Sequence, residues 1–142
     1  HVIALDKDTE RHGNVRPKIR QNPKNGDIYT QLQAGVISVY DSNLQFKYSV
    51  EDSNIVSFGG FIDDVALTLE RRPRLFSEGG NGQEELFVTL YKDGQLKDGL
   101  MGEINLTEKG FNILDVSTMY VDSGYSRFFL YQCRQILRYP QL

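Results

Sequence analysis

The residues of this chain that are best suited to metal or thiol chemistry are very few. Cys133 is the only cysteine, and His1 and His12 are the only histidines. Because a structural zinc ion takes about four cysteine or histidine ligands, these three residues are too few for such a site. Cys133 lies in the most apolar segment of the chain, where a free thiol usually behaves as a small hydrophobic side chain. We therefore expect no metal site and no cysteine nucleophile.

Carboxylates near the start of the chain have the spacing that opens a calcium-binding loop. Asp6, Asp8 and Glu10 alternate with other residues, as the first ligands of the helix-loop-helix type of site do. That loop needs glycine at its sixth position and glutamate at its twelfth. Here the sixth position is Arg11 and the twelfth is Pro17. The pattern therefore predicts a solvated turn rather than a calcium site.

Two carboxylate doublets are the remaining candidates for acid–base chemistry. Asp63-Asp64 and Glu84-Glu85 would suit glycoside hydrolysis only if two acids faced each other across a cleft. Neighbouring residues of a strand point to opposite faces, so neither doublet makes such a pair by itself. We expect both doublets to be solvated at the ends of loops.

One further segment is similar to part of a known catalytic core. Met119–Tyr125, followed by an apolar run, is similar to the acetyltransferases that bind acyl-coenzyme A. Those enzymes hold the pyrophosphate on backbone N–H groups of a glycine-rich turn. Ser126–Phe129 contains no glycine where the backbone would have to approach the phosphate. We therefore expect no catalytic residues, no cofactor and no enzyme activity.

The clearest charge pattern is a basic segment near the start of the chain. No acidic residue lies between Glu10 and Asp27. Cations that follow phosphates, together with aromatic side chains that stack on bases, are typical of single-strand binding. The net charge of −3 argues against a dedicated nucleic-acid binder. The candidate binding residues, which would otherwise dock on an acidic protein partner or stay solvated, are Arg11, Arg16, Lys18, Arg20 and Lys24.

The elements that must position these residues are predicted to be β-strands. Apolar and polar residues alternate from Leu44 to Val50, and this places all the apolar side chains on one face of a strand. The same alternation, or a high content of β-branched and aromatic residues, marks further strands. These are Val2–Leu5, Ile28–Gln33, Val36–Tyr40, Ile55–Phe58, Val65–Leu69, Leu86–Tyr91, Ile104–Leu106 and Phe111–Val121.

Turn-forming residues separate the predicted strands. Asp41–Asn43 is short enough to close a hairpin, and Asp93-Gly94 and Asp98-Gly99 are strong turn dipeptides. We expect Gly59-Gly60 to break a strand and the segment from Arg71 to Gly82 to form a loop.

The segment Tyr125–Leu137 fits two structures. Phe129, Cys133, Ile136 and Leu137 have the spacing of one face of a helix. A strand that is buried on both faces fits equally well, with Phe128 and Leu130 on one face and Phe129 and Tyr131 on the other. Because the rest of the chain is predicted to be β, a strand is favoured, and a C-terminal helix is the alternative.

These patterns together predict one antiparallel β domain over residues 1–142. About eight short strands with frequent turns are typical of a β-sandwich or barrel. Eight phenylalanines and eight tyrosines supply a hydrophobic core and exclude a disordered chain. No apolar run approaches the roughly 18–20 residues that cross a bilayer, so we expect no membrane insertion. The absence of an initiator methionine is compatible with a fragment of a longer chain.

Parts of the sequence are similar to a family of structural proteins. His1–Asp6, Lys18–Asn22 and Asn25–Leu32 resemble the N-terminal β-sandwich domain of upper-baseplate proteins from tailed phages that infect Gram-positive bacteria. Gly102–Leu106 and Gly124–Phe129 are similar to later strands of that domain. The resemblance implies a role in assembly and carries no catalytic residues.

We therefore expect a non-catalytic structural or interaction module of a phage tail baseplate. Its expected partners are other protein chains, with a homo-oligomer preferred, and its contact surfaces are the segments Arg11–Lys24 and Tyr125–Leu137. Such a protein is made in the host cytoplasm and ends in the tail of the virion, whereas a protein of other origin would stay cytoplasmic. The alternative is a small β-barrel that binds single-stranded nucleic acid or carbohydrate.

Overall fold

The structure, a computed structural model, describes residues 17–73, 84–111, 116, 118–122, 124, 126–131 and 136–137. Over these residues the chain forms three antiparallel sheets, and the short 3-10 turn η2 (Lys92–Gly94) follows the third strand of one of them. The predicted all-β fold class is therefore confirmed. The described residues contain no helix with the length and apolar character needed to span a bilayer.

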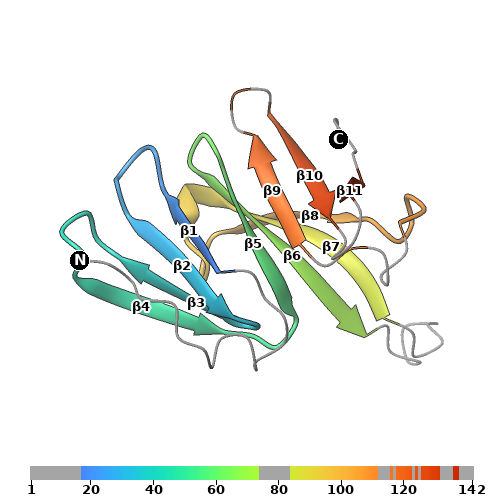
Figure 1. The fold of residues 1–142 in the computed structure, drawn as a ribbon, viewed down its shortest axis with the longest axis horizontal. Helices are drawn as coiled ribbons and strands as arrows, with labels where there is room; N and C mark the ends of the chain where they lie inside the picture. Colours follow the sequence, from blue (N-terminus) through green and yellow to red (C-terminus); the bar gives the residue numbers. More distant parts are fainter. Residues whose placement is uncertain are drawn as a thin grey trace.

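The three sheets follow one another along the chain (Figure 1). The first sheet has the order β1-β2-β3-β4 and contains β1 (Lys18–Gln21), β2 (Ile28–Gln33), β3 (Val36–Tyr40) and β4 (Phe46–Glu51). The second has the order β5-β6-β7-β8 and contains β5 (Ile55–Ile62), β6 (Val65–Pro73), β7 (Glu84–Tyr91) and β8 (Leu100–Asn105). The third has the order β11-β10-β9 and contains β9 (Thr118–Asp122), β10 (Arg127–Tyr131) and β11 (Ile136–Leu137).

Two hydrophobic cores use opposite faces of the second sheet. Leu67 and Leu69 of β6 belong to the core that includes Met119 and Phe128 of the third sheet. Ala66, the neighbour of Leu67, belongs instead to the core that the first sheet completes. Because successive side chains of a strand point to opposite faces, β6 is buried on both sides. In Figure 1, β5 and β6 accordingly lie between the first sheet and the pair β9–β10.

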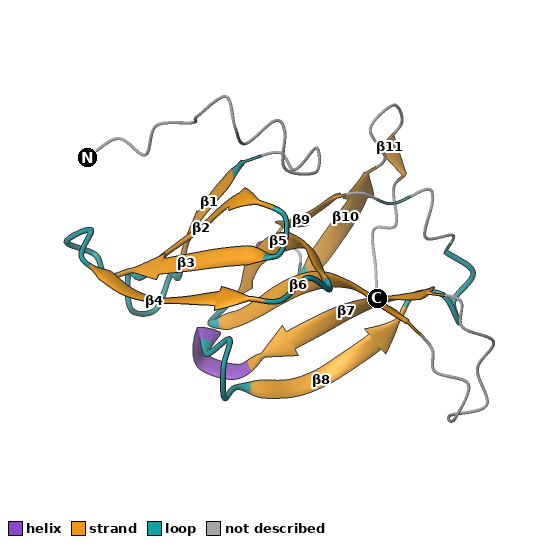
Figure 2. Cartoon of the chain, turned by 90° about the horizontal axis from the view of Figure 1, so that it is seen from below, coloured by secondary structure: helices purple, strands orange, loops and turns teal. Residues whose placement is uncertain are grey.

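The first sheet is also attached to the second through η2, which follows β7 (Figure 2). The hydroxyl of Tyr29 donates a hydrogen bond of 2.7 Å to the carbonyl oxygen of Gly94. The Tyr29 ring stacks on Phe58 at 5.4 Å and meets the edge of Phe61 at 4.8 Å between ring centroids. Such pairs add stability beyond the burial of their area, so this aromatic cluster holds the first sheet on β5.

The close contact between β5 and β9 depends on a glycine. A side chain at Gly59 would collide with the terminal methyl group of Met119 and would crowd Val121 and the backbone of Leu67. Gly60, the next residue, has a φ of 130°, which glycine adopts without the steric penalty of other residues. The pair of glycines therefore lets β9 approach β5, and the predicted strand break at this point is wrong, because β5 continues through both residues.

Other turn predictions have mixed outcomes. The hairpin at Asp41–Asn43 is confirmed, since the Asp41 carboxylate accepts hydrogen bonds from the backbone N–H groups of Asn43 and Gln45. Leu44 lies in the turn with a φ of 65°, so the following strand begins at Phe46 instead. Asp93 and Gly94 both have positive φ values in η2, as the dipeptide predicts.

The limits of several strands differ from the prediction. β6 extends to Pro73, so the expected loop does not begin at Arg71, and residues 74–83 lie outside the described residues. Of the segment Tyr125–Leu137, the described residues form strands β10 and β11 rather than a helix. Phe111 is not in a strand, and β9 covers only the end of the predicted segment. The strand predicted at Val2–Leu5 lies outside the described residues.

Candidate interaction surfaces

The five basic residues singled out in the sequence have different environments. Arg11 and Arg16 lie outside the described residues. Lys18 is buried with a relative exposure of 3%, Arg20 is half-buried, and Lys24 is exposed. The described part of the segment therefore does not form a continuous basic surface.

Lys18 joins strands from all three sheets. Its amino group donates hydrogen bonds to the hydroxyl of Ser57 on β5 and to the carbonyl oxygen of Met119 on β9. The hydroxyl of Ser57 also accepts a hydrogen bond of 3.2 Å from the backbone N–H of Met119. Burial, and to a smaller extent the positive charge of Arg20, lower the pKa of Lys18 to about 7. Lys18 is therefore part of the packing between sheets and not a surface cation.

Lys24 is paired with one member of a carboxylate doublet. Its amino group lies 3.1 Å from the Asp64 carboxylate, and this hydrogen bond raises the pKa of Lys24 and lowers that of Asp64. Asp63 and Asp64 lie in the turn between β5 and β6, where both are accessible to solvent. The first carboxylate doublet thus has the solvated position that its sequence predicts.

The second doublet also has structural partners. Glu84 lies 3.7 Å from the guanidinium group of Arg71. Glu85 accepts a hydrogen bond of 3.0 Å from the side-chain amide of Asn105. The two side chains point to opposite faces of β7, because adjacent residues of a strand do so. Neither doublet provides two facing acids.

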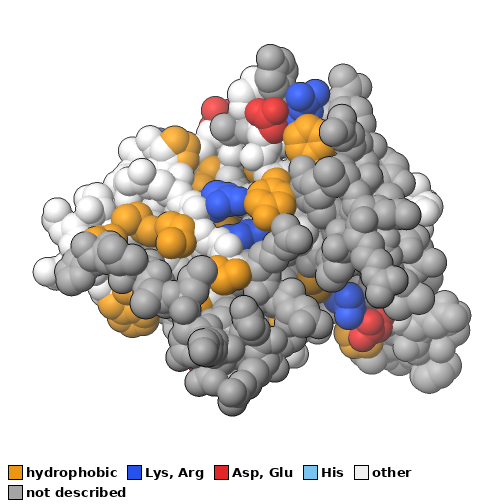
Figure 3. Space-filling view, in the orientation of Figure 1, with side chains coloured by type: hydrophobic (Ala, Val, Ile, Leu, Met, Phe, Trp, Pro, Cys, Tyr) orange, Lys and Arg blue, Asp and Glu red, His pale blue; other side chains and the backbone are white. Residues whose placement is uncertain are grey.

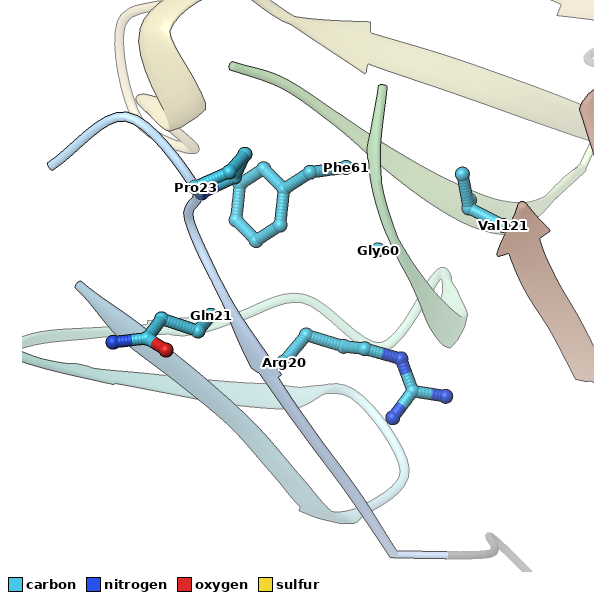
Figure 4. Close-up of a pocket in the computed structure, with 6 residues that line it drawn as sticks. All are labelled: Arg20, Gln21, Pro23, Gly60, Phe61 and Val121. Carbon is cyan, nitrogen blue, oxygen red and sulfur yellow. The ribbon is translucent and has the colours of Figure 1, made fainter. Parts of the chain in front are cut away.

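Arg20 lines a hollow between β1, β5 and β9 (Figure 4). The hollow has a volume of about 170 Å³ and is lined by Arg20, Gln21, Pro23, Gly60, Phe61 and Val121. One guanidinium nitrogen of Arg20 donates a hydrogen bond of 2.9 Å to the carbonyl oxygen of Ile19. Figure 3 shows Lys and Arg side chains beside hydrophobic ones at the centre of this face, between the first sheet and β9.

Strand β8 is an open edge of the second sheet within the described residues. Leu100 and Met101 on it have relative exposures of 59% and 56%. Leu90 pairs with Gly102 and Tyr91 pairs with Leu100, so Met101 is the extra residue of a β-bulge. No atom lies within 4 Å of the position that a Cβ of Gly102 would occupy. The edge strand therefore combines two exposed apolar side chains with an open space on the face of the sheet at Gly102.

The sequence patterns do not predict a polar network that lies on β6 and β7. The buried carboxylate of Glu70 accepts hydrogen bonds from the hydroxyls of Thr68 at 2.9 Å and Tyr91 at 3.0 Å. Arg72 contacts the same carboxylate at 3.3 Å and Glu103 at 2.5 Å. Because these polar atoms satisfy one another, the network is suited to holding strands together rather than to acid–base chemistry.

The exposed residues on β8 were also missed, although the sequence contains a signal for them. Leu100 and Met101 are adjacent apolar residues, and this interrupts the alternation of a half-buried strand. For metal chemistry, no group of three or more histidine, cysteine, aspartate or glutamate side chains that could hold an ion exists among the described residues.

Comparison with known proteins identifies no relative. No protein-family model, no curated protein and no solved structure matches this chain.

Proposed function

We propose that this chain is a non-catalytic structural module that associates with a second copy of itself through the open edge of β8. The observation that carries the proposal is the exposure of Leu100 and Met101 on β8, a strand that has a neighbour on only one side among the described residues. An edge strand has unpaired N–H and C=O groups, which can pair with a strand of another chain. Burial of the two apolar side chains adds a hydrophobic contribution to that pairing.

The charges on β8 favour an identical partner strand. Soluble proteins commonly protect an edge with lysine or proline, and the sequence of β8, LMGEIN, contains neither. Its one acidic residue, Glu103, is already paired with Arg72. Two copies related by a two-fold axis would present the same patch to each other, and neither would bring an unpaired charge into the contact.

The resemblance to upper-baseplate domains supports a phage tail baseplate as the assembly in which this contact operates. Repeated contacts between identical surfaces are the usual basis of symmetric assemblies. Nucleic-acid binding has less support, because Lys18 is buried and Lys24 is paired with Asp64.

Sedimentation velocity over a range of concentrations tests the proposal. We expect a monomer–dimer equilibrium for the wild type and a monomer for Met101→Lys, since a lysine at this position would bring two like charges into the contact. Phe46→Lys is the matched control, because Phe46 is 61% exposed on β4, which is also an edge strand. A wild type that stays monomeric at every concentration, or a Met101→Lys variant that still dimerises, would overturn the proposal.

A further inference from the structure

Two basic side chains of β1 share one aromatic ring and have no acidic partner among the described residues. The Lys18 amino group lies 4.4 Å and the Arg20 guanidinium carbon 5.4 Å from the centroid of the Tyr120 ring. The ion pairs of the described residues involve other cations. Positive charge is thus concentrated where β1 meets β9, and an anion beside Arg20 would reduce the repulsion between the two cations.

Among the described residues, no carboxylate pairs with Lys18. Arg20 faces it from β1 and Tyr120 from β9, while β5 contributes the hydroxyl of Ser57. A second hydroxyl, that of Thr118, lies 3.2 Å from the Ser57 hydroxyl. Burial is the main cause of the lowered pKa of Lys18, and the positive charge of Arg20 lowers it further.

Both polar and apolar groups line the hollow beside Arg20, and the apolar side chains are those of Pro23, Phe61 and Val121. In Figure 4 the aliphatic part of Arg20 passes Gly60, and the ring of Phe61 lies next to Pro23. Gly60 has no side chain to fill the space, and Val121 of β9 forms the far wall. At about 170 Å³, the hollow is smaller than the roughly 300 Å³ at which pockets for drug-sized ligands begin. It suits a group of a few heavy atoms.

We propose that this hollow binds a carboxylate carried on a short apolar body, with Arg20 holding the carboxylate and Phe61, Pro23 and Val121 contacting the body. A guanidinium group presents parallel N–H donors that match the two oxygens of a carboxylate. The same chemistry is offered by a free small acid and by the C-terminal residue of a peptide. The site lies at β5, across the second sheet from the β8 edge, so it does not rest on the proposed dimer.

Titration of the ¹⁵N-labelled protein with isovalerate, followed by amide chemical shifts, tests this proposal. We expect saturable shifts of the Gly60 and Val121 amides with isovalerate and none with isovaleramide, which lacks the charge. Arg20→Gln should weaken binding about tenfold or more, because a charge-assisted hydrogen bond is lost. Lys24→Gln is the control: it removes one positive charge near the site from a residue already paired with Asp64, and it should leave the affinity unchanged.

Titrations with other ligands distinguish which kind of anion the hollow binds. Inorganic phosphate should bind more weakly than isovalerate, and equal affinity would overturn the role of the apolar walls. Acetyl-Ala-Leu with a free C-terminus, compared with its C-terminal amide, tests the peptide source; tighter binding than isovalerate supports a chain terminus, and weaker binding supports a free acid. Absence of shifts at Gly60 and Val121, or an unchanged affinity in Arg20→Gln, would overturn the proposal. The monomeric Met101→Lys variant should give the same titration, which keeps this test separate from that of the β8 contact.

Discussion

The amino group of Lys18 donates a hydrogen bond to the hydroxyl of Ser57, and this contact joins β1, an edge strand of the first sheet, to β5, an edge strand of the second. A lysine side chain with 3% exposure and no acidic partner among the described residues is costly to fold in its charged form. Burial, and to a smaller extent the charge of Arg20, lower the pKa of Lys18 to about 7, so its amino group loses its proton more easily in the folded chain. The free energy of unfolding should therefore depend on pH through Lys18 above about pH 7.

The first prediction concerns Lys18 and the free energy of unfolding. The pKa is about 7 in the folded chain and about 10.4 in an unfolded one, so the unfolded state binds more protons between these values. Stability should rise with pH over this range, by up to about 1.4 kcal/mol per pH unit, and the cost of burying the charge should be fully present below pH 7. Lys18→Met should remove this slope in urea denaturation between pH 7 and about 9.5.

Two further variants control this prediction. Lys97 is exposed, so Lys97→Met should keep the slope of the wild type. Lys18→Arg should lose the slope while being destabilised at every pH, because a guanidinium group stays charged. Measurements stop below pH 10, since burial raises the pKa of Tyr29 and Tyr91 and stability falls again once unfolded tyrosines ionise. A wild-type slope that survives in Lys18→Met would contradict the assignment.

The second prediction concerns Gly59 and the approach of β9 to β5. A methyl group at this position meets Met119 and lies 3.2 Å from Val121 and 3.3 Å from the carbonyl oxygen of Leu67. Gly59→Ala should therefore destabilise the fold by about 1–3 kcal/mol, which is typical of overpacking. Gly102→Ala is the matched control within a strand, because its Cβ enters open space, and its stability should equal or slightly exceed that of the wild type. Thermal unfolding followed by circular dichroism, at a concentration where the chain is monomeric, measures both.

The role of Gly59 shows why the sequence predicts the fold class better than its details. The two-residue alternation from Leu44 to Val50 is a local property, and it predicts the strand β4, although the strand begins only at Phe46. From local sequence, a pair of glycines that ends a strand cannot be told from a pair that lets another strand pack closely. Here the packed residue, Met119, is distant in sequence. The packing of the third sheet against β5 could therefore not be predicted from local patterns.

The candidate site shows the same limit. Charge counting groups Lys18, Arg20 and Lys24 as one basic segment. Lys18 and Arg20 share one face of β1 but differ in burial, and Lys24 lies exposed in the turn that follows. Burial of Lys18 depends on Ser57 and Met119, which local sequence cannot bring together. Leu100 and Met101 were detectable in principle, because two adjacent apolar residues break the expected pattern.

The third prediction separates two neighbouring arginines of β6. Arg72 contacts the buried carboxylate of Glu70 at 3.3 Å and donates a hydrogen bond of 3.0 Å to the hydroxyl of Thr89. Arg71, by contrast, lies 3.7 Å from Glu84 with both side chains substantially exposed. Removal of one partner of a buried ion pair leaves an uncompensated charge, whereas an exposed pair contributes about 0–1 kcal/mol. The two arginines should therefore differ in their effect on stability.

Arg72→Met should destabilise the fold by about 1–3 kcal/mol, a value reduced from that of a fully buried pair because Arg72 is itself partly exposed. Arg71→Met should change stability by less than about 0.5 kcal/mol. A double-mutant cycle with Glu70→Gln tests the cause, since removing the charge of Glu70 should recover part of the loss in Arg72→Met. Urea denaturation at pH 7 measures all four variants. Equal losses in Arg71→Met and Arg72→Met, or additive effects of Arg72→Met and Glu70→Gln, would show that the Glu70 carboxylate does not depend on Arg72 for its compensation.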